Sequence, residues 1–285
     1  MLKSIYLHFG LNNVQFVIYL AEIWVYPIKS LGGIALPDAR VEMRGLEHDR
    51  RWMLVDESGR FMSQREFPLM TQLSCSLTAT HLEVFHKKMP HQRLRIPFDW
   101  PESALIPMQV SIWDDTLEAL AYPETFNTWF SVHLGAPLTL VKIPDAARRI
   151  TDPRYAPEGQ HVSLSDGFPY LLISEASLAA LNERLELPLP MNRFRPNLVV
   201  CGALPHAEDE WSDFRIDAVP FRGVKPCARC VVTTTDQENG MRSAEPLRTL
   251  ATYRKQGNKI LFGQNVIWTG HAPASISVGD LLVFD

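Results

Sequence analysis

The 285-residue sequence is poor in cysteine and carries no excess of basic charge. Four cysteines in a chain of this length are too few for a disulfide scaffold, which suits a reducing compartment. The 28 lysines and arginines are interspersed with 32 acidic residues, giving a net charge of −4. The basic footprint typical of nucleic-acid binders is therefore absent, and we predict a cytoplasmic protein that does not bind nucleic acid.

Long apolar runs are also missing from the sequence. Residues 1–20 are fairly apolar, but polar residues such as His8 and Gln15 interrupt them, and Lys3 alone supplies positive charge. A signal peptide needs an unbroken apolar centre, and a membrane helix needs about twenty clean apolar residues. We therefore interpret residues 1–18 as an N-terminal extension and predict that the protein does not associate with a membrane.

Internal repeats and a glycine-rich phosphate loop are lacking too, so no repeat architecture and no nucleotide-binding fingerprint is indicated. The sequence does contain many short segments of β-branched and aromatic residues, separated by Pro, Gly and Asp turns. This pattern favours barrels or sandwiches over a parallel α/β sheet. The expected strands include Val14–Tyr26, Arg51–Val55, Leu117–Ala121, Leu138–Lys142, Leu198–Cys201, Val231–Thr235, Lys259–Phe262 and Asp280–Phe284.

Three segments have helical spacing instead, namely Pro123–Leu134, Ser174–Leu185 and Glu245–Gln256. Their caps and stops agree with that spacing, since a serine opens the second segment and Gly135 and Gly257 follow the first and third. We therefore predict a fold that is mainly β with a few helices. The most natural boundary precedes the first helix, which gives one domain at 19–121 and a second at 122–285.

The most informative segment contains Cys227 and Cys230, two thiols flanked by Lys225 and Arg229. A structural zinc site would need two more ligands at matching spacing, and a thioredoxin-like pair would open a helix rather than precede a strand. A disulfide between the two would close a very small, strained loop. Two interpretations stay open: one thiolate that binds a metal or substrate, or two ordinary buried cysteines.

Three further clusters carry groups suited to an anion. Lys29 and Ser30 follow an expected strand end, Arg50 precedes the strand at 51–55, and Arg195 and Asn197 alternate onto one side of the chain. An ammonium, a hydroxyl and planar guanidinium groups are the usual donors to phosphate. Each cluster taken alone also fits a solvent-facing turn or strand edge.

In their order along the chain, these clusters resemble the MOSC family, and most closely the branch that includes the mitochondrial amidoxime-reducing component and its bacterial relatives. The resemblance runs from about residue 20 to residue 285. The segments that carry it are Val25–Ser30, Asp49–Trp52, Ser63–Glu66, Ile173–Leu178, Phe194–Asn197, the cysteine pair, Glu245–Leu247 and Phe262–Gln264.

The resemblance implies an N-terminal β-barrel-like domain, a second barrel-like MOSC domain and a molybdopterin-type molybdenum cofactor held between the two. Cys230 corresponds to the molybdenum ligand at the catalytic position, and Cys227 to a neighbour that does not bind the metal. Gly167 and Phe168 stand where relatives carry small hydroxylated residues. The positions implied to hold the pterin and its phosphate are Lys29, Ser30, Arg50, Arg195, Asn197 and Arg229.

The implied reaction is the two-electron reduction of a small N-hydroxylated substrate such as an amidoxime. Some relatives carry a plant-type ferredoxin domain, but its C-x4-C-x2-C pattern is missing here. Electrons would then come from an external partner, an iron–sulfur, flavin or haem protein. A second interpretation also stays open, in which the protein carries the cofactor or transfers sulfur without reductase turnover.

Overall fold

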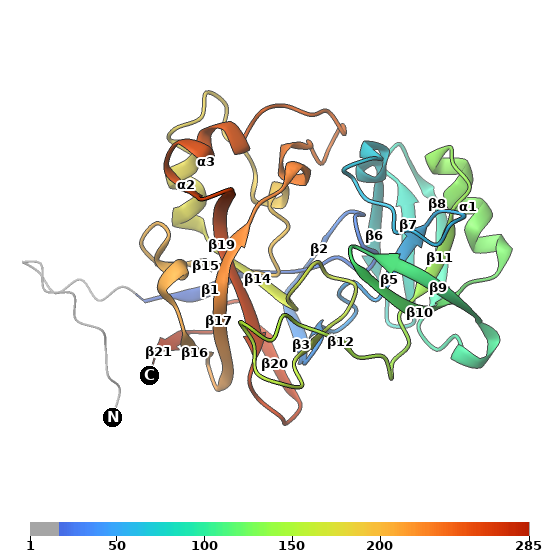
Figure 1. Cartoon of the computed structure of the whole chain (residues 1–285), viewed down its shortest axis with the longest axis horizontal. Coiled ribbons are helices and arrows are strands. Elements are labelled where there is room, and N and C mark those ends of the chain that lie inside the picture. Colours follow the sequence, from blue (N-terminus) through green and yellow to red (C-terminus); the bar gives the residue numbers. More distant parts are fainter. Residues whose placement is uncertain (1–16, 285) are drawn as a thin grey trace, which may run out of the picture.

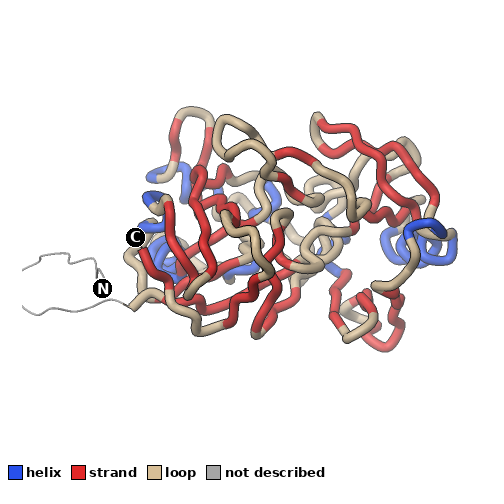
Figure 2. The backbone as a smooth tube through the Cα atoms, turned by 90° about the horizontal axis from the view of Figure 1, so that it is seen from below, coloured by secondary structure: helices blue, strands red, loops and turns tan. Residues whose placement is uncertain are grey.

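The protein consists of two β-rich lobes placed side by side (Figure 1). The computed structural model describes residues 17–284, so most of the expected N-terminal extension lies outside the described residues. Seen from below, the helices lie mainly towards the two outer ends, with strands and loops between them (Figure 2). Within residues 17–284, no helix is long and apolar enough to cross a membrane.

The first lobe contains two small antiparallel sheets and one helix. One sheet has the order β5-β11-β10-β9 and the other the order β6-β7-β8. The elements are β5 (Trp52–Val55), β6 (Leu73–Leu77), β7 (His81–His86), β8 (Met89–Pro97), β9 (Ile106–Ile112), β10 (Asp115–Ala121), α1 (Glu124–Leu134) and β11 (Thr139–Lys142). Two short 3-10 turns, η1 (Pro68–Gln72) and η2 (Glu102–Ala104), complete the lobe.

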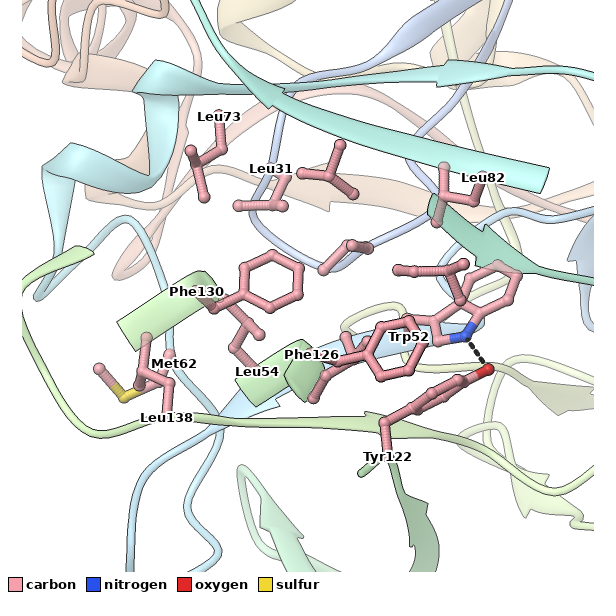
Figure 3. Packing of buried hydrophobic residues seen from close by; sticks show 14 of the residues in the cluster. Leu31, Trp52, Leu54, Met62, Leu73, Leu82, Tyr122, Phe126, Phe130 and Leu138 are labelled. Atoms are coloured by element: carbon pink, nitrogen blue, oxygen red, sulfur yellow. Dashed lines mark hydrogen bonds between the residues drawn. The ribbon is translucent and has the colours of Figure 1, made fainter. Parts of the chain in front are cut away.

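The core of the first lobe explains why β5 is a continuous apolar run. Trp52 and Leu54 point into one apolar cluster, whereas Met53 and Val55 point into another on the opposite face. Helix α1 buries Phe126 in the first of these clusters (Figure 3). In the same view the Trp52 indole Nε1 donates a hydrogen bond of 3.0 Å to the Tyr122 hydroxyl.

The second lobe is built on one large sheet with the strand order β2-β1-β15-β14-β19-β17-β16-β21, to which β18 adds beside β19. A smaller sheet of order β20-β3-β4 packs against its apolar face, since both sheets contribute to one core cluster. The N-terminal strands are β1 (Tyr19–Val25), β2 (Ile34–Leu36), β3 (Asp38–Glu42) and β4 (Gly45–Leu46). The remaining strands are β14 (Tyr170–Ser174), β15 (Leu198–Cys201), β16 (Asp213–Ile216), β17 (Val219–Ala228), β18 (Lys255–Gln256), β19 (Lys259–Trp268), β20 (Ala274–Ser277) and β21 (Leu282–Phe284).

Two helices and three 3-10 turns cover this lobe: α2 (Glu175–Asn182), α3 (Leu247–Tyr253), η3 (Met191–Arg193), η4 (Ala207–Glu210) and η5 (Val231–Thr234). A two-stranded ribbon of β12 (Arg149–Ile150) and β13 (His161–Val162) follows β11 and precedes β14 in the sequence. The prediction of a mainly β fold with a few helices is confirmed, because residues 17–284 form mostly strands and three α-helices. The expected closed barrels are not found among these residues, since β2 and β21 end the large sheet without pairing with each other.

The three predicted helices are present. Gly135 ends α1 in the left-handed conformation with φ 69°, and the Ser174 hydroxyl accepts a hydrogen bond from the Ser177 amide at the start of α2. Helix α3 is shorter than expected and ends at Tyr253, because the next residues turn into β18. The predicted helical periodicity therefore located each helix, although not every helix end.

The structure departs from the expected boundary at residue 121. Strand β11 pairs with β10 and β5, and α1 packs into the first-lobe core, so the first lobe extends past residue 121. Strand β1 pairs with β15, and β3 pairs with β20, so the start of the chain belongs to the second lobe. The lobes of the structure and the predicted boundary before the first helix differ because β-pairing is non-local, and a helix after a turn can still pack back onto the preceding strands.

Candidate functional site

A cleft between the lobes is lined by all seven residues that the family resemblance implied as contacts of the cofactor or its metal. Its volume is about 920 Å³ when its open mouth is included. Seven of the residues that line it are Lys29, Ser30, Arg50, Arg195, Asn197, Arg229 and Cys230. Segments far apart in the sequence thus place basic, amide, hydroxyl and thiol groups around one space.

Lys29 lies on the segment that leaves β1 and crosses to the first lobe. Its amide donates to the Trp52 carbonyl at 2.8 Å, which pairs this segment with the start of β5. Its ammonium is buried and contacts the Leu164 carbonyl at 2.9 Å and the Asp166 carboxylate at 2.5 Å. Burial lowers the pKa of Lys29, and the negative charge of Asp166 opposes that change.

Ser30 and Arg50 both have positive φ, 69° and 48°, a conformation that L-residues adopt rarely. The Arg50 guanidinium is held firmly, with bonds of 2.7 Å to the Asp49 carboxylate and 3.0 Å to the Asn197 side-chain oxygen. Asn197 in turn donates to the Trp24 carbonyl at 3.1 Å. These turns and bonds fix two of the expected cofactor contacts before any ligand is bound.

Arg195 is different because its guanidinium has no carboxylate or hydrogen-bond partner within residues 17–284. It lies over the Tyr26 ring at 4.2 Å, and Arg50 lies over the same ring at 4.3 Å. Burial, reinforced by the positive charge of Arg50, lowers the pKa of Arg195 to about 10. A half-buried guanidinium with no ion pair among the described residues thus lines the cleft, and an anionic ligand could bind it directly.

The sequence predicted a strand directly after the cysteine pair, but the structure has a 3-10 turn there. Cys227 lies at a β-bulge near the end of β17, and Cys230 caps the 3-10 turn η5. The expected strand at 231–235 is wrong because Thr233 and Thr234 donate their hydroxyl hydrogen bonds to carbonyls three residues earlier, at 2.9 and 2.7 Å. These local bonds stabilise a helical turn despite the β-branched composition.

Arg229 contacts the Cys227 thiol and not the Cys230 thiol, which is the expected metal ligand. One of its terminal nitrogens donates to the Cys227 sulfur at 3.1 Å, and the other donates to the Phe194 carbonyl at 2.6 Å. Its Nε is buried without a partner. Cys230, by contrast, is a half-buried free thiol that lines the cleft, with no hydrogen bond to its sulfur among the described residues.

The loop before β14 supplies the remaining wall. Gly167 and Phe168 both line the cleft, although they stand where relatives carry small hydroxylated residues. Ser165 lines it as well, and its buried hydroxyl lacks a hydrogen-bond partner in the part of the chain that the structure describes. Sequence reasoning missed Ser165, although a small hydroxylated residue two positions before Gly167 was the available signal.

Sequence reasoning also missed the first-lobe wall, which consists of Phe61, Ser63, Arg65 and Trp113. Arg65 belongs to a segment that carried the family resemblance, but no role followed from it. Trp113 lies at the tip of the β9–β10 hairpin, and nothing in its neighbourhood in sequence indicates a site. Only the approach of the two lobes brings these residues to the cleft.

Comparisons with known proteins agree with this arrangement. The family model described as MOSC N-terminal beta barrel domain matches residues 17–137, and the model described as MOSC domain matches residues 159–283. The first match, like the packing of α1, runs past residue 121.

Curated relatives fall into two groups. The chain is 31% identical to mitochondrial amidoxime-reducing component 1 of Homo sapiens, over 92% of this chain and 81% of that protein. It is also 31% identical to mitochondrial amidoxime reducing component 2 of Rattus norvegicus, over 85% and 74%. Molybdenum cofactor sulfurase of Oryza sativa subsp. japonica is 32% identical over 86% of this chain, which spans only 32% of that longer protein.

Proposed function

The chain belongs to the MOSC family, and from that premise we propose that it binds a molybdenum cofactor and reduces N-hydroxylated compounds. The observation that carries the proposal is the convergence of Lys29, Arg50, Arg195 and Arg229 with the Cys230 thiol in one cleft. Relatives of similar length are amidoxime-reducing components, which favours reduction over other molybdenum chemistry.

The residues present fit such a cofactor in their chemistry. A pterin phosphate would supply the counter-charge that Arg195 and the orphaned Nε of Arg229 lack. Lys29 and Ser30 would add an ammonium and a hydroxyl from the crossing segment. The Cys230 thiolate would add one soft sulfur ligand to the two sulfurs of the pterin.

When bound, the cofactor supplies a metal that cycles through two electrons. In the proposed reaction the N–O bond of an amidoxime breaks, two electrons and two protons are consumed, and an amidine and water are released. The electrons come from an external iron–sulfur, flavin or haem protein. The protein's own residues orient the substrate and hold charge, with Arg50 kept rigid by Asp49 and Asn197.

The test is to purify the protein from a host that makes molybdopterin and from a matched host that cannot. With a chemical reductant, benzamidoxime reduction is expected only in the first preparation and in proportion to its molybdenum content. Metal-free protein from the competent host, or equal turnover from both preparations, would contradict the proposal.

A second candidate function is sulfur transfer or cofactor carriage, and one contact favours it. The Arg229 guanidinium donates to the Cys227 sulfur at 3.1 Å, a contact that would also hold a persulfide on that residue. Relatives named molybdenum cofactor sulfurase point the same way, although the chain spans about a third of their length. Mass spectrometry would detect a persulfide on Cys227, and its presence without reductase turnover would favour this function.

A further inference from the structure

The tip of the β9–β10 hairpin has an unusual residue for its turn. Ile112 pairs with Asp115, so the turn has two central residues, Trp113 and Asp114. Trp113 has φ 55°, a position that such turns usually give to glycine. A bulky residue persists in this conformation only where its surroundings hold it there.

The contacts of Trp113 explain what holds it. Its indole Nε1 donates to the Asp166 carboxylate at 3.1 Å, and this carboxylate also pairs with Lys29. The ring meets the edge of Phe61 with 4.7 Å between ring centroids. The hairpin tip is thereby fixed across the mouth of the cleft with 38% of Trp113 exposed.

The Arg65 guanidinium stacks on this indole at 4.1 Å. It has no carboxylate partner and no hydrogen bond to its side chain among residues 17–284. Arg60, close by, is the opposite case, because it binds Glu66 with two hydrogen bonds of 3.0 and 2.7 Å. Arg65 therefore presents an oriented set of unused donors beside an aromatic face.

Arg65 and Trp113 also line a second cavity. Its volume is about 640 Å³ including its open mouth, and every residue that lines it comes from the first lobe. Phe61, Ser63, Arg65 and Trp113 line both this cavity and the cleft. None of the seven residues predicted from the sequence lines it, so a cofactor held by those residues leaves this extension free.

We propose that Arg65 and Trp113 form a specificity subsite for substrates that carry a carboxylate on an aromatic ring. The inference rests on the proposed reductase function and names the substrate class. The guanidinium binds the carboxylate with two parallel hydrogen bonds, and the indole stacks on the ring. Asp114, an exposed acid that also lines the second cavity, repels further negative charge and favours a single carboxylate.

The test compares 4-carboxybenzamidoxime with benzamidoxime as substrates of the molybdenum-loaded protein. Wild-type kcat/KM is expected to be higher for the carboxylate, and Arg65→Gln is expected to reduce that preference about tenfold while benzamidoxime turnover persists. Arg222→Gln is the control, because that half-exposed arginine pairs with Asp213 and lines neither the cleft nor the second cavity. Its preference should equal that of the wild type.

A binding measurement without turnover separates the two proposals. Calorimetry on loaded, oxidised protein without reductant should show 4-amidinobenzoate binding more tightly than benzamidine, and Arg65→Gln should abolish the difference. No reduction of either amidoxime, with this binding difference intact, would overturn the reductase function and leave the subsite standing. An unchanged substrate preference in Arg65→Gln, or a loss of bound molybdenum in that variant, would overturn the subsite.

Discussion

The two walls of the cleft differ in how their charged groups are held. On one side Arg50, Lys29 and Arg229 are fixed by bonds to carboxylates, carbonyls and a thiol, whereas the Arg195 guanidinium has no hydrogen bond or ion pair within residues 17–284. On the other side Arg65 lies on Trp113 with its donors unused. Under the proposed function, the wall with Arg50, Lys29, Arg195 and Arg229 would hold the resident anionic cofactor, and the wall with Arg65 and Trp113 would contact the substrate that exchanges.

The largest expected effect is the loss of bound cofactor in Arg195→Gln, which changes the wall with the predicted cofactor contacts. Cofactor retention should fall about 10- to 100-fold, as is typical when a supporting contact to a bound metal group is removed. The fold should survive, because Arg195 has no ion pair to break within the described chain. Molybdenum content after gel filtration measures the change.

The control is Arg154→Gln, since Arg154 is exposed and pairs with Asp152 outside the cleft. Its molybdenum content should match the wild type. If both variants lose cofactor equally, Arg195 has no special role, and the two walls do not differ in the proposed way.

A smaller effect is expected from Trp113→Gly, which acts on the other wall. The preference for benzamidoxime over acetamidoxime should fall about tenfold, because ring stacking is lost. The free energy of unfolding should change by less than about 1 kcal/mol, since glycine relieves the positive φ while the indole contacts disappear.

Chemical denaturation and steady-state kinetics measure these two quantities. Trp129→Leu on α1 is the control for the loss of a tryptophan, because Trp129 packs on Phe130 and His133 and does not line the cleft. This variant should keep the wild-type preference for benzamidoxime. If Trp113→Gly keeps the wild-type preference for benzamidoxime, the Trp113 indole does not contact the substrate.

The smallest expected effect is a pH-dependent change in stability, caused by the buried Glu208 of η4. Glu208 is buried, one of its oxygens accepts from the Ser174 amide at 3.2 Å, and the other has no partner among the described residues. Burial raises its pKa, so the folded state binds this proton more tightly than the unfolded state does. Stability from this group is therefore present at low pH and is lost as the pH rises through the raised pKa.

Glu208→Gln should accordingly stabilise the protein at pH 8 and have little effect at pH 4. Urea denaturation at both values measures the difference. Glu175→Gln, at the exposed start of α2, serves as the control, because its carboxylate is not buried. A stabilisation of Glu208→Gln that does not grow with pH would contradict the assignment.

The sequence identified many of the residues that line the cleft, because they stand in short ordered segments that carry basic, hydroxyl, amide and thiol groups. The helices were predictable as well, since Ser174 and Gly135 cap them by local bonds. The cysteine pair was misread in its surroundings because Thr233 and Thr234 bond back to carbonyls and outweigh their β propensity.

The first-lobe wall could not be predicted because it depends on contacts between distant segments. Trp113 reaches the cleft only through the pairing of β9 with β10 and through the Asp166 carboxylate of another loop. Arg65 meets its indole 48 positions away in the sequence, a distance that no local pattern encodes. The lobes do not divide the chain near residue 121 for the same reason, because β1 and β11 pair with strands far away in the sequence.

The most direct test of the account is the molybdenum content of two cysteine variants purified from a molybdopterin-competent host. Cys230→Ser should lose bound molybdenum and all benzamidoxime reduction, because the proposed metal ligand is removed. Cys227→Ser should keep both, because Cys227 contacts Arg229 and is not the proposed ligand. Equal molybdenum content and equal turnover in the two variants would contradict the central claim that Cys230 holds the metal.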